Sequence, residues 1–200
     1  MTASRRLLLA KMKDEKRCPL CALVQEEEFS LLSKLQYNVS QSERVRRGIP
    51  YGGGFCDFHF RQFRKIANNR TNAVLLLSFI GYVEQHKSPP SIRCRLCATL
   101  SSYEKQMVLA MVDILKDQGQ RDLYSKSAGL CFPHAETVLR LLKPLPLKRW
   151  LKGMQKQQLL REIPALESLA SKSYYNTSGE ERGAIPRVSE KFVGRKAIGL

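Results

Sequence analysis

The stretch Gly129-Leu130-Cys131-Phe132-Pro133-His134 places a cysteine and a histidine three residues apart. The same frame occurs earlier, in Gly54-Phe55-Cys56-Asp57-Phe58-His59. Thiolate sulfur and imidazole nitrogen are the ligands that Zn(II) prefers in proteins, and closely spaced pairs of them are typical of structural zinc sites. The repeated frame therefore predicts that metal ions organise this fold.

The other four cysteines form two C-x-x-C pairs. Cys18 and Cys21 precede the first C-x-x-H motif, and Cys94 and Cys97 precede the second. The C-x-x-C pairs lie 76 residues apart and the C-x-x-H motifs 75 residues apart, which predicts an internal duplication with one single-residue insertion. Of the three histidines only His86 lies outside the motifs, and we interpret it as a surface residue.

Two pairs of sulfur and nitrogen ligands suit a closed tetrahedral Zn(II) site, so we expect two zinc ions per chain. Iron–sulfur clusters, a redox dithiol and a catalytic zinc are the alternatives. Ala22 and Ala98 follow the C-x-x-C pairs, so the haem attachment motif is absent. We expect each repeat to complete its own site, with the ligands Cys18, Cys21, Cys56 and His59 in the first and Cys94, Cys97, Cys131 and His134 in the second.

Each C-x-x-C opens an apolar stripe with helical spacing. The first stripe contains Val24, Glu28, Leu31 and Leu35, and the second contains Leu100, Glu104, Met107 and Met111. An unpaired acid on an apolar face is costly to bury. We therefore expect Glu28 and Glu104 to contact the metal-binding histidine, an arginine such as Arg46, Arg47 or Arg121, or the other repeat, unless the stripe is rotated and both are solvated.

Each C-x-x-H also begins a helix, and a further helix is expected from about Leu147 to Ala170, with a bend at Pro164. We interpret the segments 44–54 and 119–129 as turn-rich links, the first of which delivers Cys56. Strand patterns are weak throughout. The predicted fold is mainly α, with two pseudo-symmetric helical repeats, 1–88 and 89–172, each pinned by a Cys3His site, and a basic tail, 173–200, that ends in a short helix near 188–194.

The composition favours an anionic partner. The 200 residues include 34 Lys and Arg against 18 Asp and Glu, a net charge of +16, and 43% are hydrophobic, enough for a folded core. Basic residues alternate with aromatic ones around Phe60 and Trp150, a pattern found in RNA-binding surfaces. The apolar runs at Leu7–Ala10 and Ala73–Val83 are too short for a signal sequence or a membrane helix. We expect a cytoplasmic protein with no membrane association.

In order and spacing these motifs, closing on Phe192-Val193-Gly194-Arg195, resemble a prokaryotic family whose members carry a duplicated CPxC…GFCxxH unit and have no established activity. The resemblance covers about Cys18 to Arg195 and implies the same eight metal ligands. The chain departs from the family pattern at Arg95, where the first repeat has Pro19.

These observations favour a zinc-binding, non-enzymatic module whose basic surface binds nucleic acid (RNA or DNA) or an acidic protein. The first alternative is an electron-transfer protein that holds iron–sulfur clusters in both sites. The second is a zinc enzyme in which Glu28 or Glu104 acts as acid or base.

Overall fold

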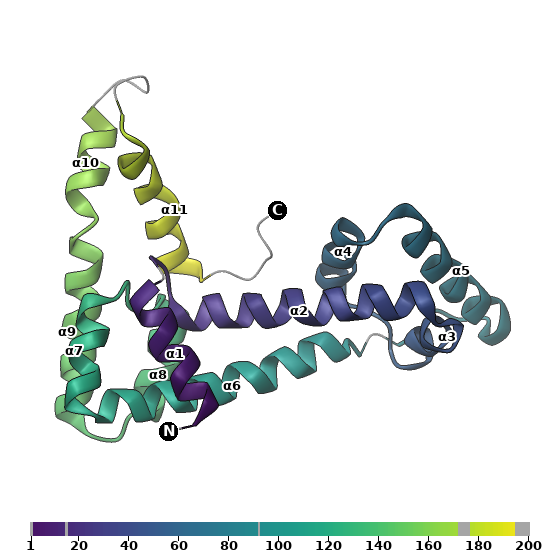
Figure 1. Cartoon of the computed structure of the whole chain (residues 1–200), viewed down its shortest axis with the longest axis horizontal. Helices are drawn as coiled ribbons and strands as arrows, with labels where there is room; N and C mark the ends of the chain where they lie inside the picture. The colour runs from purple at the N-terminus through teal and green to yellow at the C-terminus, as the bar shows by residue number, and fades with distance from the viewer. Residues whose placement is uncertain (1, 15, 92, 172–176, 195–200) are drawn as a thin grey trace. The chain divides into compact units, whose positions relative to one another are not determined.

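The computed structural model describes residues 2–14, 16–91, 93–171 and 177–194. In these ranges the chain is helical and contains no strand, which confirms the mainly α prediction (Figure 1). The first half contains α1 (Ala3–Asp14), α2 (Pro19–Gln41), α3 (Glu43–Tyr51), α4 (Asp57–Ile66) and α5 (Asn69–His86). The second half contains α6 (Arg95–Lys116), α7 (Gln118–Lys126), α8 (Phe132–Leu141), α9 (Leu145–Leu160), α10 (Ile163–Ser171) and α11 (Gly179–Val193). None of the described helices is both long and apolar enough to span a bilayer.

The chain divides into two compact units. Unit 1 combines the residues up to Val24 with those from Glu104 onward, and unit 2 is formed by Gln25–Tyr103. Both boundaries fall inside long helices, α2 and α6. Each unit therefore draws residues from both predicted repeats, 1–88 and 89–172, and the internal duplication itself stays a prediction from the sequence.

Unit 2 has an aromatic core between α2, α4 and α5. Phe63 and Leu32 are fully buried, and Phe55 stacks on Phe63 with ring centroids 5.5 Å apart. In the part of α2 that belongs to unit 2 the buried positions are Glu28, Leu32 and Val39, whereas Leu31 and Leu35 of the predicted stripe are only half-buried. The buried face is thus rotated slightly from the predicted one, and Glu28 still lies on it.

Unit 1 is built around the buried side chain of Tyr124. Its hydroxyl accepts a hydrogen bond from the backbone N–H of Leu130 at 3.2 Å. Two buried amides on α9 complete the network, since Gln155 donates to the Leu130 carbonyl and Gln158 to that of Tyr124, each at 3.1 Å. These bonds satisfy buried backbone groups in the segment that leads to Cys131.

The two predicted turn-rich links are mostly helical. Segment 44–54 contains most of α3 and segment 119–129 most of α7. Each helix begins at a side-chain cap, Ser42 for α3 and Asp117 for α7, which accepts a backbone N–H of the first turn. The glycines and Pro50 suggested turns, but the caps and the end of the preceding helix determine the local structure. Only the last residues of each segment form the predicted turn.

The C-terminal region is also more helical than predicted. The expected helix 147–170 is divided into α9 and α10 near Arg161, slightly before Pro164. The short helix predicted near 188–194 is the end of α11, which begins at a capping box formed by Ser178 and Glu181 and ends at Gly194, where φ is 68°. The predicted turn around Tyr174 and the last six residues lie outside the described residues.

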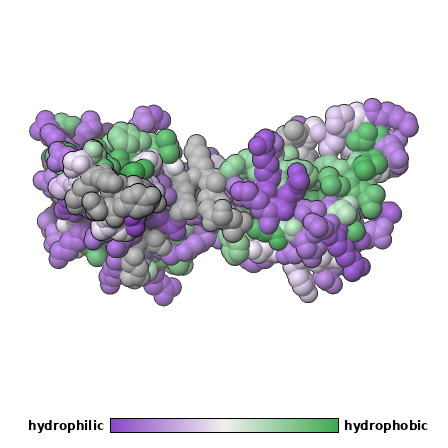
Figure 2. All heavy atoms as spheres, turned by 90° about the horizontal axis from the view of Figure 1, so that it is seen from above, coloured by the Kyte–Doolittle hydropathy of each residue, from purple (hydrophilic) through white to green (hydrophobic). Residues whose placement is uncertain are grey.

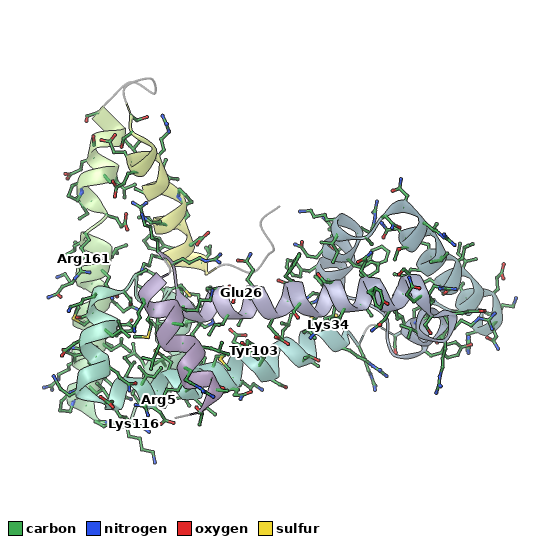
Figure 3. The ribbon with its side chains drawn as sticks, in the orientation of Figure 1. Arg5, Glu26, Lys34, Tyr103, Lys116 and Arg161 are labelled. Atoms are coloured by element: carbon green, nitrogen blue, oxygen red, sulfur yellow. The ribbon has the colours of Figure 1, made fainter. Side chains whose placement is uncertain are left out.

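The surface combines hydrophilic and hydrophobic areas (Figure 2). Arg5 on α1, Lys34 on α2, Lys116 on α6 and Arg161 after α9 illustrate how widely the basic side chains are distributed (Figure 3). Some of them have acidic partners, such as Arg5, which joins α1 to Asp117 at 3.2 Å.

Two glycines make a matched test of this packing. Gly129 has a φ of 71°, and an added Cβ would overlap the side-chain amide of Gln158, whereas a Cβ at Gly153 in α9 would meet nothing within 4 Å. We expect Gly129→Ala to lower the free energy of unfolding by more than about 1 kcal/mol, and Gly153→Ala to raise it by up to about 1 kcal/mol. Urea denaturation of the two variants measures both effects, and equal effects would contradict the packing of Gln158 on Gly129.

Candidate metal centres

The eight predicted ligands lie in two clusters. Cluster A contains Cys18, Cys21, Cys131 and His134, and cluster B contains Cys56, His59, Cys94 and Cys97. Within each cluster the four ligand atoms all lie within 4.8 Å of one another. Cluster A belongs to unit 1 and cluster B to unit 2, so that each unit contains one candidate metal centre.

The predicted pairing within each repeat is wrong. Each C-x-x-C meets the C-x-x-H of the other repeat. The physical reason is the length of α2, whose 23 residues extend about 34 Å in a continuous helix. This helix carries the chain away from Cys18 and Cys21, and the nine residues of α3 are too short to bring Cys56 back.

Both clusters are assembled from helix N-termini. Cys56 and Cys131 are the N-cap residues of α4 and α8, and each motif histidine lies in the first turn. The carbonyls of Cys18 and Cys94 accept the first backbone hydrogen bonds of α2 and α6. A helix N-terminus has a positive partial charge and free N–H groups, which stabilise a thiolate. In cluster B such an N–H group contacts a cysteine directly, because the Cys56 sulfur accepts a hydrogen bond from the backbone N–H of His59 at 3.5 Å.

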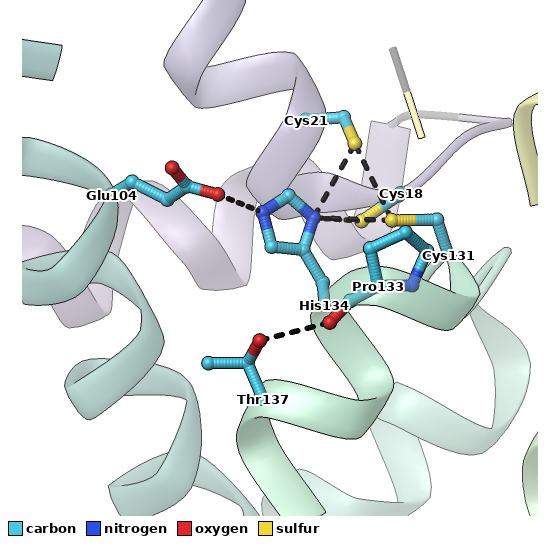
Figure 4. Close-up of polar contacts among 7 residues, drawn as sticks. All are labelled: Cys18, Cys21, Glu104, Cys131, Pro133, His134 and Thr137. Atoms are coloured by element: carbon cyan, nitrogen blue, oxygen red, sulfur yellow. Dashed lines mark hydrogen bonds and ion pairs between the residues drawn. The ribbon is translucent and has the colours of Figure 1, made fainter. Parts of the chain in front are cut away.

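Cluster A is compact (Figure 4). The Nδ1 of His134 lies 3.5 Å from the sulfur of Cys18, 3.4 Å from that of Cys21 and 3.2 Å from that of Cys131. The sulfurs of Cys21 and Cys131 are 3.6 Å apart. Because one nitrogen faces three sulfurs, the side chains converge on a common centre.

Cluster B repeats this arrangement. The Nδ1 of His59 lies 3.2 Å from the sulfurs of Cys56 and Cys97 and 3.4 Å from that of Cys94. The sulfurs of Cys56 and Cys97 are 3.5 Å apart. The two clusters therefore share the ligand set, the ligating histidine nitrogen and the spacing.

In each cluster the second histidine nitrogen faces the glutamate of the predicted stripe. The Nε2 of His134 is 2.8 Å from a carboxylate oxygen of Glu104, and that of His59 is 3.4 Å from Glu28. Of the partners that the sequence allowed, the structure selects the motif histidine. The first contact is a hydrogen bond, whereas the second is an ion-pair distance that lacks hydrogen-bond geometry. Glu28 is buried, while the side chain of Glu104 is 46% exposed.

The electrostatics of both clusters favour a cation at the centre. Burial by itself would lower the pKa of His59, but Glu28 and the neighbouring cysteine sulfurs raise it to about 9. The pKa of His134 is raised in the same way, mainly by Cys131 against the effect of burial. In cluster B, burial and the adjacent cysteines raise the pKa of Cys97 to about 12, whereas backbone hydrogen bonds and His59 outweigh burial and lower that of Cys94 to about 7. A positive charge among the sulfurs is thus stabilised.

Glycine lets the backbone approach closely beside cluster B. Gly53 has a φ of 94°, and its carbonyl accepts the N–H of Arg93 at 2.9 Å. A Cβ at Gly53 would lie 2.7 Å from the Cβ of Arg93. This contact holds the segment before Cys56 against the segment before Cys94, which brings the two halves of the cluster together.

Lys191 of α11 and Gly194, the C-cap of this helix, lie near cluster A, and the spacing of the cysteine and histidine motifs does not indicate either contact. An added Cβ at Gly194 would be 3.4 Å from the sulfur of Cys131, so the end of α11 covers the cluster. Lys191 is buried beside it and donates to the carbonyl of Ala128. Burial lowers the pKa of this lysine, while the charges of Cys18 and Cys131 oppose that effect. Only the fold brings this distant helix to the ligands.

Comparison with known proteins adds no relative to this picture. No protein-family model, curated protein or solved structure matches the chain. The resemblance to a prokaryotic family therefore stays a prediction, and the functional argument depends on the geometry of the two clusters.

The clusters differ in exposure, and this predicts different reactivity. All four ligands of cluster A are buried, whereas Cys97 in cluster B is exposed and Cys56 and Cys94 are half-buried. We expect iodoacetamide to label the cysteines of cluster B before Cys18, Cys21 or Cys131 in the native protein, because only cluster B is open to the reagent. Peptide mass spectrometry over a time course measures this order, and labelling of cluster A at the same rate would contradict it.

Proposed function

We propose that the protein is a zinc-binding, non-enzymatic helical module that binds one Zn(II) in each cluster and presents a basic surface to nucleic acid. Cys18, Cys21, Cys131 and His134 would bind the first ion, and Cys56, His59, Cys94 and Cys97 the second. The observation that carries this proposal is the convergence of three sulfurs and one imidazole nitrogen in each unit. The zinc would have a structural role, because all four coordination positions are filled by the protein.

The distances fit zinc. A regular tetrahedron with Zn–S of about 2.3 Å and Zn–N of about 2.0–2.1 Å has edges of about 3.8 Å between sulfurs and about 3.5–3.6 Å between sulfur and nitrogen. The sulfurs of Cys21 and Cys131 are 3.6 Å apart in cluster A, and those of Cys56 and Cys97 are 3.5 Å apart in cluster B. The sulfur–nitrogen distances are 3.2–3.5 Å. The sulfur–sulfur and sulfur–nitrogen distances are slightly shorter than these edges. A small outward shift of the ligand atoms would therefore accommodate one ion.

The same distances argue against an iron–sulfur cluster. In such a cluster the cysteines bind different iron atoms, so their sulfurs lie farther apart than one coordination edge. Here all four ligand atoms of each site lie within 4.8 Å. A single ion is therefore favoured over a multi-iron electron-transfer centre.

The glutamates support a structural role as well. Each contacts the histidine nitrogen that faces away from the sulfurs, the position that fixes the ring orientation and increases ligand basicity in metal sites. A catalytic acid or base would have to face an open metal position. Glu28 and Glu104 therefore act best as positioning residues, which favours the non-enzymatic interpretation.

The strongest concentration of positive charge is on α9. This helix contains Lys148, Arg149, Lys152 and Lys156 and no acidic residue. Arg149, Lys152 and Lys156 are exposed, and their spacing of three and four residues places them on one face. A row of cations without acids on the same helix is the feature that contacts phosphates in nucleic-acid-binding proteins.

A pocket with an aromatic side chain in its wall lies at the start of α9, on a different face of the helix from this row. It has a volume of about 420 Å³ and is lined in part by Trp150, Arg121 and Lys116. The guanidinium of Arg121 lies over the Trp150 ring, 5.8 Å from its centroid. Stacking surfaces next to phosphate-binding cations are typical of single-stranded nucleic acid sites. An acidic protein is the second candidate partner, but it would not need the aromatic pocket.

The number of metal ions bound by double cysteine variants tests the ligand assignment. It also tests the crossed pairing, in which each C-x-x-C shares a cluster with the C-x-x-H of the other repeat. We expect two zinc ions in the wild-type protein and one in Cys21→Ser/Cys131→Ser, because both cysteines belong to cluster A. We expect none in Cys21→Ser/Cys56→Ser, because that pair removes a ligand from each cluster. Elemental analysis of anaerobically purified protein gives the counts, with His86→Ala as a control that retains both ions.

The reverse pattern, with two ions lost from the first double variant and one from the second, would mean pairing within each repeat. Iron with acid-labile sulfide would contradict the zinc proposal.

The salt dependence of binding to a single-stranded oligonucleotide tests the partner. Phosphate contacts release counterions, so log Kd should rise linearly with log salt concentration. We expect Arg149→Gln/Lys152→Gln/Lys156→Gln to weaken binding at least tenfold at about 0.1 M salt and to reduce the slope by about 2. Fluorescence anisotropy measures both quantities.

The matched control is Arg47→Gln/Arg61→Gln/Arg140→Gln, which removes the same charge from arginines that already pair with Glu43, Asp57 and Glu136. We expect a much smaller effect in this variant. Equal losses in both variants would mean that net charge and not α9 determines binding, and no binding by the wild type would exclude this partner.

A further inference from the structure

Helix α5 of unit 2 exposes an apolar face. Leu77 is 65% exposed and Ile80 55%, and Leu76 and Val83 are more than 40% exposed. The opposite face of the helix packs on the unit 2 core through Leu75 and Phe79. Four large apolar side chains exposed on one helix are uncommon on a surface that contacts only water.

The exposed face has the spacing of a helix–helix contact. Arg70, Ala73, Leu77, Ile80 and Glu84 follow one another at intervals of three, four, three and four residues, the pattern of a packing seam. All five are exposed. The apolar centre of this row is flanked by one cation and one anion, and we call the five residues the α5 seam.

The charges of the seam are symmetric about Leu77. Arg70 lies seven residues before Leu77 and Glu84 seven residues after it. Neither forms an ion pair with another residue that the structure describes. If a second α5 packs antiparallel with its Leu77 opposite the first, each Arg70 faces the Glu84 of the other helix. One sequence thus supplies two complementary charge pairs, as a twofold interface requires.

Gly81 supports close approach by another helix. It lies inside α5, where glycine costs about 1 kcal/mol relative to alanine. An added Cβ would meet nothing within 4 Å, so no contact inside the chain requires a glycine. In the antiparallel arrangement Gly81 lies opposite Ala73 of the second helix, and these two small residues let the backbones come close.

A groove next to the seam gives the second helix additional space. It lies between α3 and α5 and has a volume of about 450 Å³, with Val74, Leu77 and Gly81 on its α5 side and Glu43, Arg46, Arg47 and Tyr51 on its α3 side. Apolar side chains of the second α5 can enter this groove. In Figure 2, hydrophobic surface is visible on unit 2, at the end of the view where Figure 1 shows α3 and α5.

From these features we propose that α5 is a dimerisation surface, on which a second copy of this chain packs antiparallel about Leu77. Charge selects this occupant over an anionic partner. Within α5 the only Lys, Arg, Asp or Glu residues are Arg70 and Glu84, so this helix is neutral in a chain of net charge +16. The inference is independent of nucleic-acid binding, because it uses none of the residues on α9.

Sedimentation equilibrium of the full zinc-loaded chain tests the proposal. We expect a particle of twice 22.8 kDa at micromolar concentration. Leu77→Glu places two carboxylates at the twofold axis and should raise the dimer Kd at least tenfold. Leu109→Glu is the matched control, because Leu109 is 56% exposed on α6 outside the seam, and it should leave the Kd unchanged.

A charge exchange tests the antiparallel register. Arg70→Glu and Glu84→Arg each turn two attractive pairs into repulsive ones and should each raise the dimer Kd by about tenfold. The double variant Arg70→Glu/Glu84→Arg restores opposite charges and should return the Kd to near the wild-type value. Circular dichroism verifies that each variant keeps its helices.

Three results would overturn the proposal. They are a wild-type protein that stays monomeric at about 100 µM, a dimer that Leu77→Glu does not weaken, and a double charge variant no better than the single ones.

Discussion

The structure depends on thiolate clusters that join helix N-termini. Each cluster combines the first turn of a long helix, α2 or α6, with the first turn of a short one, α8 or α4. Without the cysteines, each cluster would bring together two helix N-termini with positive partial charge, and their electrostatic repulsion would destabilise the fold. The cysteine sulfurs offset this repulsion, because they supply negative charge where the helix ends need it, and a divalent cation would then neutralise the sulfurs. The helix dipoles, the cysteine sulfurs and a bound metal ion would thus form one electrostatic arrangement.

The crossed pairing makes one closed loop lie inside the other. The ligands of cluster A are up to 116 residues apart in sequence, and those of cluster B up to 41, all of them between the two halves of cluster A. By loop-closure entropy, the longer loop costs only about 0.9 kcal/mol more to close than the shorter one. This difference is small compared with the free energy of binding a structural zinc ion, about 10–16 kcal/mol. Entropy therefore does not prevent the crossed arrangement, and the rigid length of α2 makes it necessary.

The sequence was sufficient to predict the helical class, the eight residues of the clusters and the importance of Glu28 and Glu104. These depend on local spacing, since C-x-x-C and C-x-x-H each fit one helical turn. It was not sufficient to predict which pairs meet, because that depends on how far α2 extends before the chain turns. The segments 44–54 and 119–129 were predicted as turn-rich links, but helices capped by Ser42 and Asp117 occupy most of them, and only the glycines next to Cys56 and Cys131 lie in the predicted turns. Lys191 reaches cluster A from a distant helix and belongs to none of the motifs, and the closing motif that contains Gly194 did not indicate its contact with the cluster.

The clusters have the same ligands but different environments, and this separates their roles. Cluster A is covered by the end of α11 and lies beside the buried Lys191, whereas Cys97 of cluster B is open to solvent. A buried metal exchanges only when the surrounding structure opens, so its lifetime depends on the local stability of unit 1. An exposed thiolate can be reached by a competing ligand without such opening. A metal ion in cluster A would thus exchange slowly, whereas one in cluster B would be more accessible to competing metals and thiols.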